Sequence, residues 1–177
     1  MKKSLLLLAM GCLVTVGFSQ TNGNDKEEQG KEVKLEGVTI TPMYNFTYHS
    51  KVSNESTPEY VQNLQKEVAN YDVTEDPNFN GDFDDFRVIF SQTNGRIIAT
   101  YDNNGKVIST FEKFKDVTPP APVRDKLHQL YPGWLIHKDI YRVTYFEDKG
   151  ATKFYQLQIR SDNDRKNIKV DEEGNIL

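Results

Sequence analysis

Hydrophobic and polar positions follow two different periods along this chain. Over residues 58–70, apolar residues recur at helical spacing, and Val61, Leu64 and Val68 form one stripe. Thr57 stands where a side-chain cap is expected, directly before Pro58. This pattern predicts an amphipathic helix with one face turned toward a core.

After this helix the period changes to alternation, which is typical of strands with one buried face. Phe86, Val88 and Phe90 fall on one face of the first such segment. Asn94-Gly95 and Asp102-Asn103-Asn104-Gly105 are strong hairpin signals. The strands expected from these signals occupy residues 86–90, 96–101, 106–111, 136–146, 153–160, 167–170 and 175–177.

A second helix is predicted between the third and fourth of these strands. Val123, Leu127, Leu130 and Tyr131 follow the i, i+4, i+7 and i+8 positions of one apolar stripe. Thr118 is the expected N-cap, and the two prolines after it suit a first helical turn. Pro132-Gly133 is expected to end the helix.

A short motif occurs twice in the chain. The segment Tyr101-Asp102-Asn103-Asn104-Gly105-Lys106-Val107-Ile108 matches Val170-Asp171-Glu172-Glu173-Gly174-Asn175-Ile176-Leu177, 69 positions later (101 to 170). Each copy closes a segment that begins with a predicted helix. We therefore predict an α+β fold of two tandem helix-plus-antiparallel-meander repeats, residues 58–115 and 116–177.

The residues before the first helix carry a different signal. Residues 1–19 resemble a cleaved secretory signal peptide, with Lys2 and Lys3 before an apolar core and a small-x-small site before Gln20. A lipoprotein anchored at Cys12 is the alternative. Residues 20–34 are polar and predicted to be a disordered leader. Residues 35–57 are predicted to be an N-terminal strand, continuing through the aromatic residues up to His49, and a linker.

Composition narrows the possible functions. The net charge of −4 becomes −6 once the signal peptide, with its two lysines, is removed. An acidic chain of this kind is expected to bind nucleic acid poorly. No later segment is apolar enough to insert into a membrane. Cys12 is the only cysteine, so the mature chain would lack thiolate chemistry and cysteine metal sites.

The second half of the chain resembles the PepSY-like family, which is similar in plan to β-lactamase-inhibitor-like proteins. The residues that carry the resemblance are 119–123, Leu127, Tyr131-Pro132-Gly133-Trp134 and 170–177, and residues 112–117 and 138–143 resemble a flavobacterial secreted branch of it. The resemblance implies secreted or periplasmic proteins with an antiparallel sheet under a helix, and a binding or protease-inhibiting role.

Chains of this branch sometimes carry the automatic name nicotinate-nucleotide adenylyltransferase, which the motifs do not support. His49, His128 and His137 are the only histidines, and none stands in an H-x-G-H motif. There is also no glycine-rich turn between a strand and a helix that would hold phosphates.

The acidic segment 76–85 is a weak candidate for calcium binding. The candidate ligands are Asp76, Asn78, Asn80, Asp82 and Asp84. The twelfth position of a calcium loop should be a bidentate glutamate, but here it is Arg87. A solvated loop rich in turn-forming residues is the alternative interpretation.

The aromatic residues offer two interpretations. Tyr131 and Trp134 are expected in the core, packed between helix and sheet, whereas Tyr141 and Tyr145 are candidates for a recognition surface. The predicted binding residues are Tyr141, Tyr145, Arg142, Gln156, Gln158 and Arg160.

Together these observations predict a periplasmic or secreted, non-enzymatic binding module with no cofactor beyond the calcium candidate. Its partner is expected to be an envelope or extracellular protein, such as a protease that it inhibits or assists. A small secreted hydrolase or metal-dependent enzyme and a calcium-stabilised envelope structural protein are the alternatives.

Overall fold

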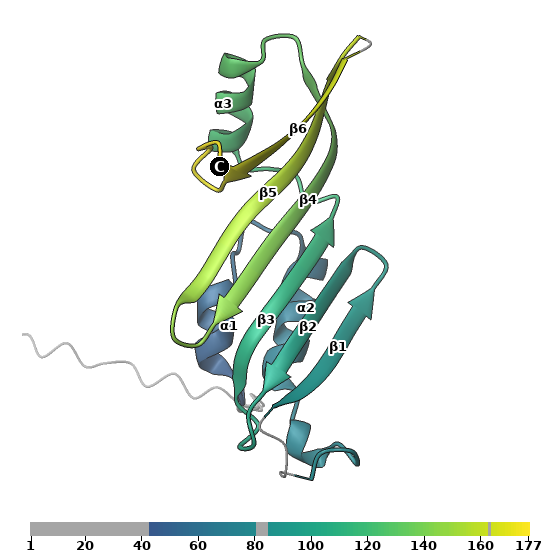
Figure 1. Cartoon of the computed structure of the whole chain (residues 1–177), viewed down its shortest axis with the longest axis vertical. Helices are drawn as coiled ribbons and strands as arrows, with labels where there is room; N and C mark the ends of the chain where they lie inside the picture. Colours follow the sequence, from purple (N-terminus) through teal and green to yellow (C-terminus); the bar gives the residue numbers. More distant parts are fainter. Residues whose placement is uncertain (1–42, 81–84, 163) are drawn as a thin grey trace, which may run out of the picture. The chain divides into compact units, whose positions relative to one another are not determined.

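The computed structural model describes residues 43–80, 85–162 and 164–177, which form an α+β fold (Figure 1). In chain order, the elements are α1 (Phe46–Val52), α2 (Glu59–Asn70), the short 3₁₀ helix η1 (Val73–Glu75), β1 (Phe86–Gln92), β2 (Gly95–Tyr101), β3 (Val107–Lys115), α3 (Ala121–Leu130), β4 (Leu135–Phe146), β5 (Gly150–Ser161) and β6 (Asp164–Asp171). The predicted signal peptide, leader and first strand segment lie outside the described residues.

The six strands form one antiparallel sheet in the order β1-β2-β3-β4-β5-β6. Each strand therefore pairs with its neighbour in sequence, and α3 is inserted between β3 and β4. The turn signals set the register, because Gln92 pairs with Gly95 around the first hairpin loop. The predicted strands 86–90 to 167–170 correspond to β1 to β6, although the third prediction begins one residue early, at Lys106. Ile176 makes an isolated bridge to Val170.

The repeated motif makes the same turn twice. Oδ1 of Asp102 accepts hydrogen bonds from the N–H groups of Asn104 and Lys106, each at 2.9 Å. Oδ1 of Asp171 accepts from those of Glu173 and Asn175, at 3.1 and 2.8 Å.

The two turns differ in their place in the fold. The first turn joins β2 to β3, whereas the second follows β6, the strand at the edge of the sheet. Two strands, β4 and β5, stand between α3 and the strand that leads into the second turn, whereas one described strand, β1, stands between α2 and the strand that leads into the first.

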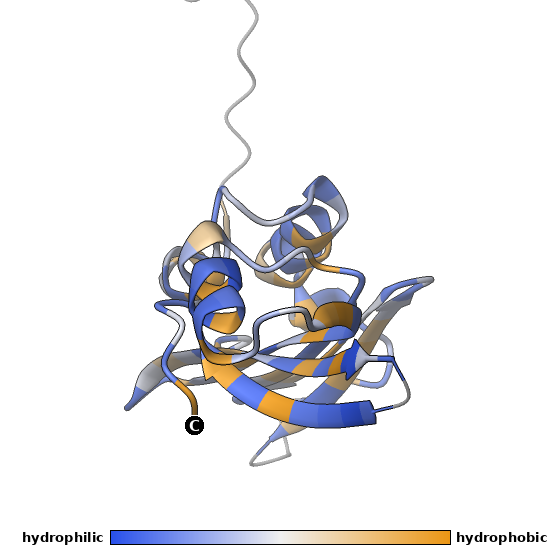
Figure 2. Ribbon diagram, turned by 90° about the horizontal axis from the view of Figure 1, so that it is seen from above, coloured by the Kyte–Doolittle hydropathy of each residue, from blue (hydrophilic) through white to orange (hydrophobic). Residues whose placement is uncertain are grey.

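The helices lie on one side of the sheet, as the view along it shows (Figure 2). Their apolar stripes face the strands, and Val61, Leu64 and Val68 of α2 are buried as predicted. On α3, Val123 and Leu127 are buried, but Leu130 is 45% exposed. The core therefore fills the space between the helices and one face of the sheet.

The expected strand character around His49 is wrong, because residues 46–52 form α1. Tyr48 and Val52, one helical turn apart, are both buried against the rest of the core. Tertiary packing therefore selects a helix where the aromatic alternation favoured a strand.

Neither threonine acts as the predicted helix cap. The N-cap positions of α2 and α3 are Pro58 and Pro120, and neither makes a side-chain cap bond. The Thr57 hydroxyl instead donates to the carbonyl of Asn54 at 2.6 Å.

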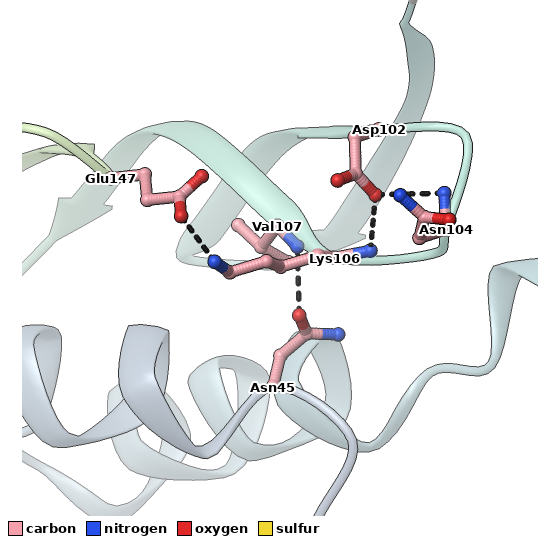
Figure 3. Close-up of polar contacts among 6 residues, drawn as sticks. All are labelled: Asn45, Asp102, Asn104, Lys106, Val107 and Glu147. Atoms are coloured by element: carbon pink, nitrogen blue, oxygen red, sulfur yellow. Dashed lines mark hydrogen bonds and ion pairs between the residues drawn. The ribbon is translucent and has the colours of Figure 1, made fainter.

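Asn45, directly before α1, ties the N-terminal helices to the first repeated turn (Figure 3). Its Oδ1 accepts from the Val107 N–H at 2.7 Å, and its Nδ2 donates to the Gly105 carbonyl at 3.3 Å. An ion pair between Lys106 and Glu147 joins the same turn to the end of β4. These contacts fix α1 relative to the start of β3.

Candidate binding surface

The face of the sheet that points away from the helices carries the side chains most available to a partner. Strand alternation places Arg142 of β4 on this face and its neighbours Tyr141 and Val143 on the buried face. We call the outward face the open face (Figure 2). Its residues follow from the registers between neighbouring strands.

A row of three cations crosses the middle of the open face. Arg96 of β2 pairs with Lys113 of β3, and Lys113 pairs with Arg142 of β4. We call these three residues the basic row. Arg96 is exposed, while Lys113 and Arg142 are half-buried.

Six further cations lie on the open face outside the basic row. By register and exposure they are Arg87, Lys115, Lys138, Arg160, Arg165 and Lys169. Among the described strand residues, the one carboxylate on this face is Asp171, which is hydrogen-bonded within its own turn. The open face is therefore basic although the chain as a whole has a net charge of −4.

An apolar stripe runs beside the basic row. Ile89 pairs with Ile98, and Ile98 pairs with Phe111, so these three side chains cross β1, β2 and β3 on the open face. Ile89 is 52% exposed and Phe111 is 51% exposed. The Phe111 ring also meets the Phe146 ring edge to face, with centroids 5.7 Å apart. We call Ile89, Ile98 and Phe111 the apolar stripe.

The other end of the open face is hollowed. A cavity of about 560 Å³ is lined by polar side chains of β4, β5 and β6 and by apolar residues, which are Lys138, Ile140, Gln156, Leu157, Gln158, Asn167, Ile168, Lys169, Ile176 and Leu177. Its volume is in the range of small-molecule sites.

Four of the six predicted binding residues lie together on the open face. The Arg142 Nε donates to Oε1 of Gln156 at 3.1 Å, and an Arg160 guanidinium nitrogen donates to Oε1 of Gln158 at 3.4 Å. Gln158 also donates to Asn167 on β6 at 3.2 Å. These bonds form two separate groups on the open face, one that joins β4 to β5 and one that joins β5 to β6.

Tyr141 and Tyr145 do not belong to this surface, and their predicted exposure is wrong. They lie on the buried face of β4, with 0% and 1% of their surface exposed. The Tyr141 hydroxyl donates to Glu172 at 2.9 Å, and the Tyr145 ring packs on Tyr48. Burial, with the Glu172 charge as a smaller cause, raises the pKa of Tyr141 well above its ordinary value. Residues 141 and 145 are an odd number of positions from Arg142, so strand alternation alone places them on the opposite face of the sheet.

Tyr131 and Trp134, expected in the core, are half-buried at the corner between α3 and β4. Their ring centroids are 6.0 Å apart, and the Lys166 ammonium lies 4.9 Å from the Tyr131 ring centroid. A small cavity of about 160 Å³ opens between this corner and Leu127. These two aromatic residues, rather than Tyr141 and Tyr145, are accessible to a partner.

The calcium candidate falls partly outside the described residues, because Asp82 and Asp84 are not described. Both oxygens of Asp76 already accept hydrogen bonds, from the Tyr71 hydroxyl at 2.8 Å and from the N–H of Asn78 at 2.9 Å. These bonds hold the pKa of Asp76 below its usual value, with the Asn78 backbone as the largest cause. Among the described residues, no three His, Cys, Asp or Glu side chains gather closely enough to hold a metal ion.

A buried carboxylate lies on the opposite face of the sheet, under the helices. Glu112 of β3 accepts from Tyr48 at 2.8 Å, from Thr110 at 2.9 Å and from Gln65 at 2.7 Å. Burial raises the pKa of Glu112, and these three donors partly oppose the shift. With 2% of its surface exposed, Glu112 belongs to the core rather than to a binding site.

No family model matches this sequence, and no curated protein sequence matches it either. Among the helices formed by described residues, none is long and apolar enough to cross a membrane.

Proposed function

We propose that this protein is a non-enzymatic binding module of the periplasm or the extracellular space, and that the open face of its sheet holds a macromolecular partner. One observation carries the proposal. Unpaired cations and exposed apolar side chains lie side by side on the open face, with no helix of the described residues packed over it. Interfaces between proteins combine these features, with an apolar centre and a polar rim.

The pairing state of the cations supports this function. Within the described part of the chain, the one ion pair is Lys106–Glu147, which lies outside the open face. Cations of the basic row therefore have no carboxylate partner within the sheet. A partner that brings carboxylates to this face would supply the missing interactions.

The sequence resemblance points in the same direction. PepSY-like proteins are secreted or periplasmic, and a binding or protease-inhibiting role has been proposed for that family. The tandem-repeat plan belongs to the same hypothesis, and the turns at Asp102 and Asp171, with one geometry, support it. The export part of the proposal rests on residues 1–19, and the intact mass of the exported protein tests it: a chain beginning at Gln20 is expected.

The chemistry of the mature chain supports binding over turnover. Removal of residues 1–19 takes away the one cysteine of the sequence. The three histidines lie on different elements, His49 on α1, His128 on α3 and His137 on β4. The mature chain then offers no cysteine thiolate, and no two of its histidines share an element, which leaves few of the usual means of activating a nucleophile.

A pull-down from native envelope extract with the purified mature protein tests the proposal. Arg142→Glu with Arg160→Glu reverses two open-face charges and is expected to abolish retention of the partner. Lys66→Glu with Lys126→Glu makes the same change of charge on α2 and α3, on the other side of the sheet, and is the matched control. Equal retention by both double variants would contradict a role for the open face. Reproducible catalytic turnover, lost on a single substitution, would contradict the whole proposal.

A further inference from the structure

The basic row and the apolar stripe form two parallel lines on the open face. Each line crosses the strands, so its side chains repeat at the strand spacing of about 4.8 Å. On β2, Ile98 and Arg96 are two positions apart, as are Phe111 and Lys113 on β3. The lines are therefore separated by about 7 Å, the distance between alternate residues of a strand.

The basic row is unfavourable in the isolated molecule. Like charges directly opposite one another on neighbouring strands destabilise a sheet. The chain has 26 acidic residues against 22 lysines and arginines, so the composition would readily have supplied carboxylates for alternate positions. In the described residues the three cations instead stand next to one another with no ion pair. The repulsion is relieved when an anionic group covers the row.

The apolar stripe limits which kind of anionic partner can cover the basic row. A purely anionic ligand would neutralise the row but would leave Ile89 and Phe111, each about half exposed, in contact with water. A partner that covers both lines must carry apolar groups about 7 Å from its carboxylates. Its side chains must also repeat at close to 4.8 Å.

The repeat distance favours a helix over a strand. Side chains on one face of a helix are about 5–6 Å apart at i, i+3 and i+4, close to the spacing between neighbouring strands. Alternate side chains of an extended strand are about 7 Å apart and lose register with the row after two residues. The helices α1 and α2 already pack on the buried face, and α2 buries Val61, Leu64 and Val68 at helical spacing.

We infer that the partner docks an acidic amphipathic helix across the open face, with its apolar side chains on the apolar stripe and its carboxylates on the basic row. The inference rests on the proposed function and names the chemistry of the partner. The contact is that of a helix laid with its apolar face on a complementary surface.

The test uses the mature protein and synthetic peptides of about five helical turns. The first peptide carries leucines on one helical stripe and glutamates on the next. The second has the same composition in scrambled order, and the third has lysine in place of glutamate. Fluorescence anisotropy is expected to show that the first binds at least roughly tenfold more tightly than the other two. Its binding is also expected to weaken with added salt.

Variants locate the binding on the two lines. Arg96→Glu with Arg142→Glu is expected to weaken the binding of the first peptide by more than roughly tenfold. Ile89→Ser with Phe111→Ser is expected to weaken the binding of the same peptide without changing how that binding depends on salt. Arg96→Gln with Arg142→Gln removes the charges but keeps polar side chains, and it serves if charge reversal disturbs folding, as judged by thermal melting. The control Lys66→Glu with Lys126→Glu is expected to leave binding unchanged.

Each contrary outcome has one meaning. If the first peptide does not bind, or binds equally well to every variant, the inference of an acidic helix is wrong. If heparin, single-stranded DNA or vesicles containing phosphatidylglycerol bind in its place and depend on Arg96 and Arg142, the open face binds a different class of partner and the proposed binding function stands. If these probes do not depend on the basic row and the pull-down does not depend on Arg142 and Arg160, the proposed function is wrong as well.

Discussion

Tyr48 of α1 donates a hydrogen bond of 2.8 Å to the carboxylate of Glu112, which lies 64 positions later on β3. Both side chains are buried, with 1% and 2% of their surface exposed. Gln65 of α2 donates to the other oxygen of the same carboxylate at 2.7 Å. One carboxylate thus connects both N-terminal helices to the centre of the sheet, and the stability of this connection depends on its protonation.

Glu112→Gln is expected to change how stability depends on pH. Because burial raises the pKa of Glu112, the folded state holds the proton more tightly than the unfolded state. The wild-type free energy of unfolding should therefore fall as the pH rises from about 4.3, the ordinary glutamate pKa, through the raised value. The variant has no such titration. It should lose less stability than the wild type between pH 4 and pH 7, as measured by urea unfolding across this range.

The surroundings of Glu112 can accommodate the glutamine. The Gln65 Oε1 is buried without a hydrogen-bond partner, so rotation of the Gln65 amide would let it accept from a new amide at position 112. Glu67→Gln, an exposed change on α2, is the matched control. A variant destabilised equally at both pH values would show that the three hydrogen bonds to the carboxylate balance the cost of burying its charge, so that its pKa is not raised.

Gly174→Ala is expected to destabilise the protein more than Gly150→Ala. Both glycines have positive φ, 90° and 78°, so both substitutions carry a backbone cost of about 1–2 kcal/mol. A Cβ at 174 would lie 2.7 Å from the Pro122 carbonyl oxygen, whereas a Cβ at 150 would meet nothing within 4 Å. The difference in urea midpoint between the two variants measures this steric contact. Equal midpoints would show that the second repeated turn can move away from α3.

The sequence was most informative where local rules decide the structure. Alternation and the turn signals at Asn94 and Asp102 located the strands, because both act over a few neighbouring residues. Local rules failed for α1, whose burial depends on Tyr48 reaching Glu112 far along the chain. They also failed for the corner residues Tyr131 and Trp134, whose exposure depends on how α3 sits on β4 and β5.

The candidate surface shows the same division. The chemistry of Arg142 and Gln156 was predictable from their place on exposed strand positions, and the error over Tyr141 was avoidable from alternation alone. The basic row was not predictable from alternation, since it requires the pairing of Arg96 with Lys113 and of Lys113 with Arg142. The register describes which residues of two neighbouring strands pair, so it cannot be deduced from the sequence of one strand alone.

Leu127→Ala is expected to destabilise the protein by about 2–5 kcal/mol, because it leaves a cavity under α3. Leu127 is 6% exposed and packs into the core. Leu130→Ala on the same helix is the control: that side chain is 45% exposed, so its loss should change stability by at most about 0.5 kcal/mol. Chemical denaturation of both variants measures the two costs. Similar values would mean that α3 does not hold its described position on the sheet in solution.

Calcium is expected to stabilise the protein only at millimolar concentration. Asp76 must release its hydrogen bonds from Tyr71 and Asn78 before it can act as a full ligand, and the bidentate glutamate of a strong loop is missing. At 100 times the dissociation constant, a real site would add about 2.7 kcal/mol to the free energy of unfolding.

Thermal melting with calcium, with magnesium and with neither tests the calcium prediction. Asp76→Asn, which keeps an oxygen to accept from Asn78, is the matched variant. A rise in melting temperature that is specific to calcium and reduced in Asp76→Asn would establish the site. An unchanged melting temperature at tens of millimolar calcium, well above the dissociation constants of roughly 0.1–1 mM of weak extracellular sites, would show that the calcium prediction is wrong.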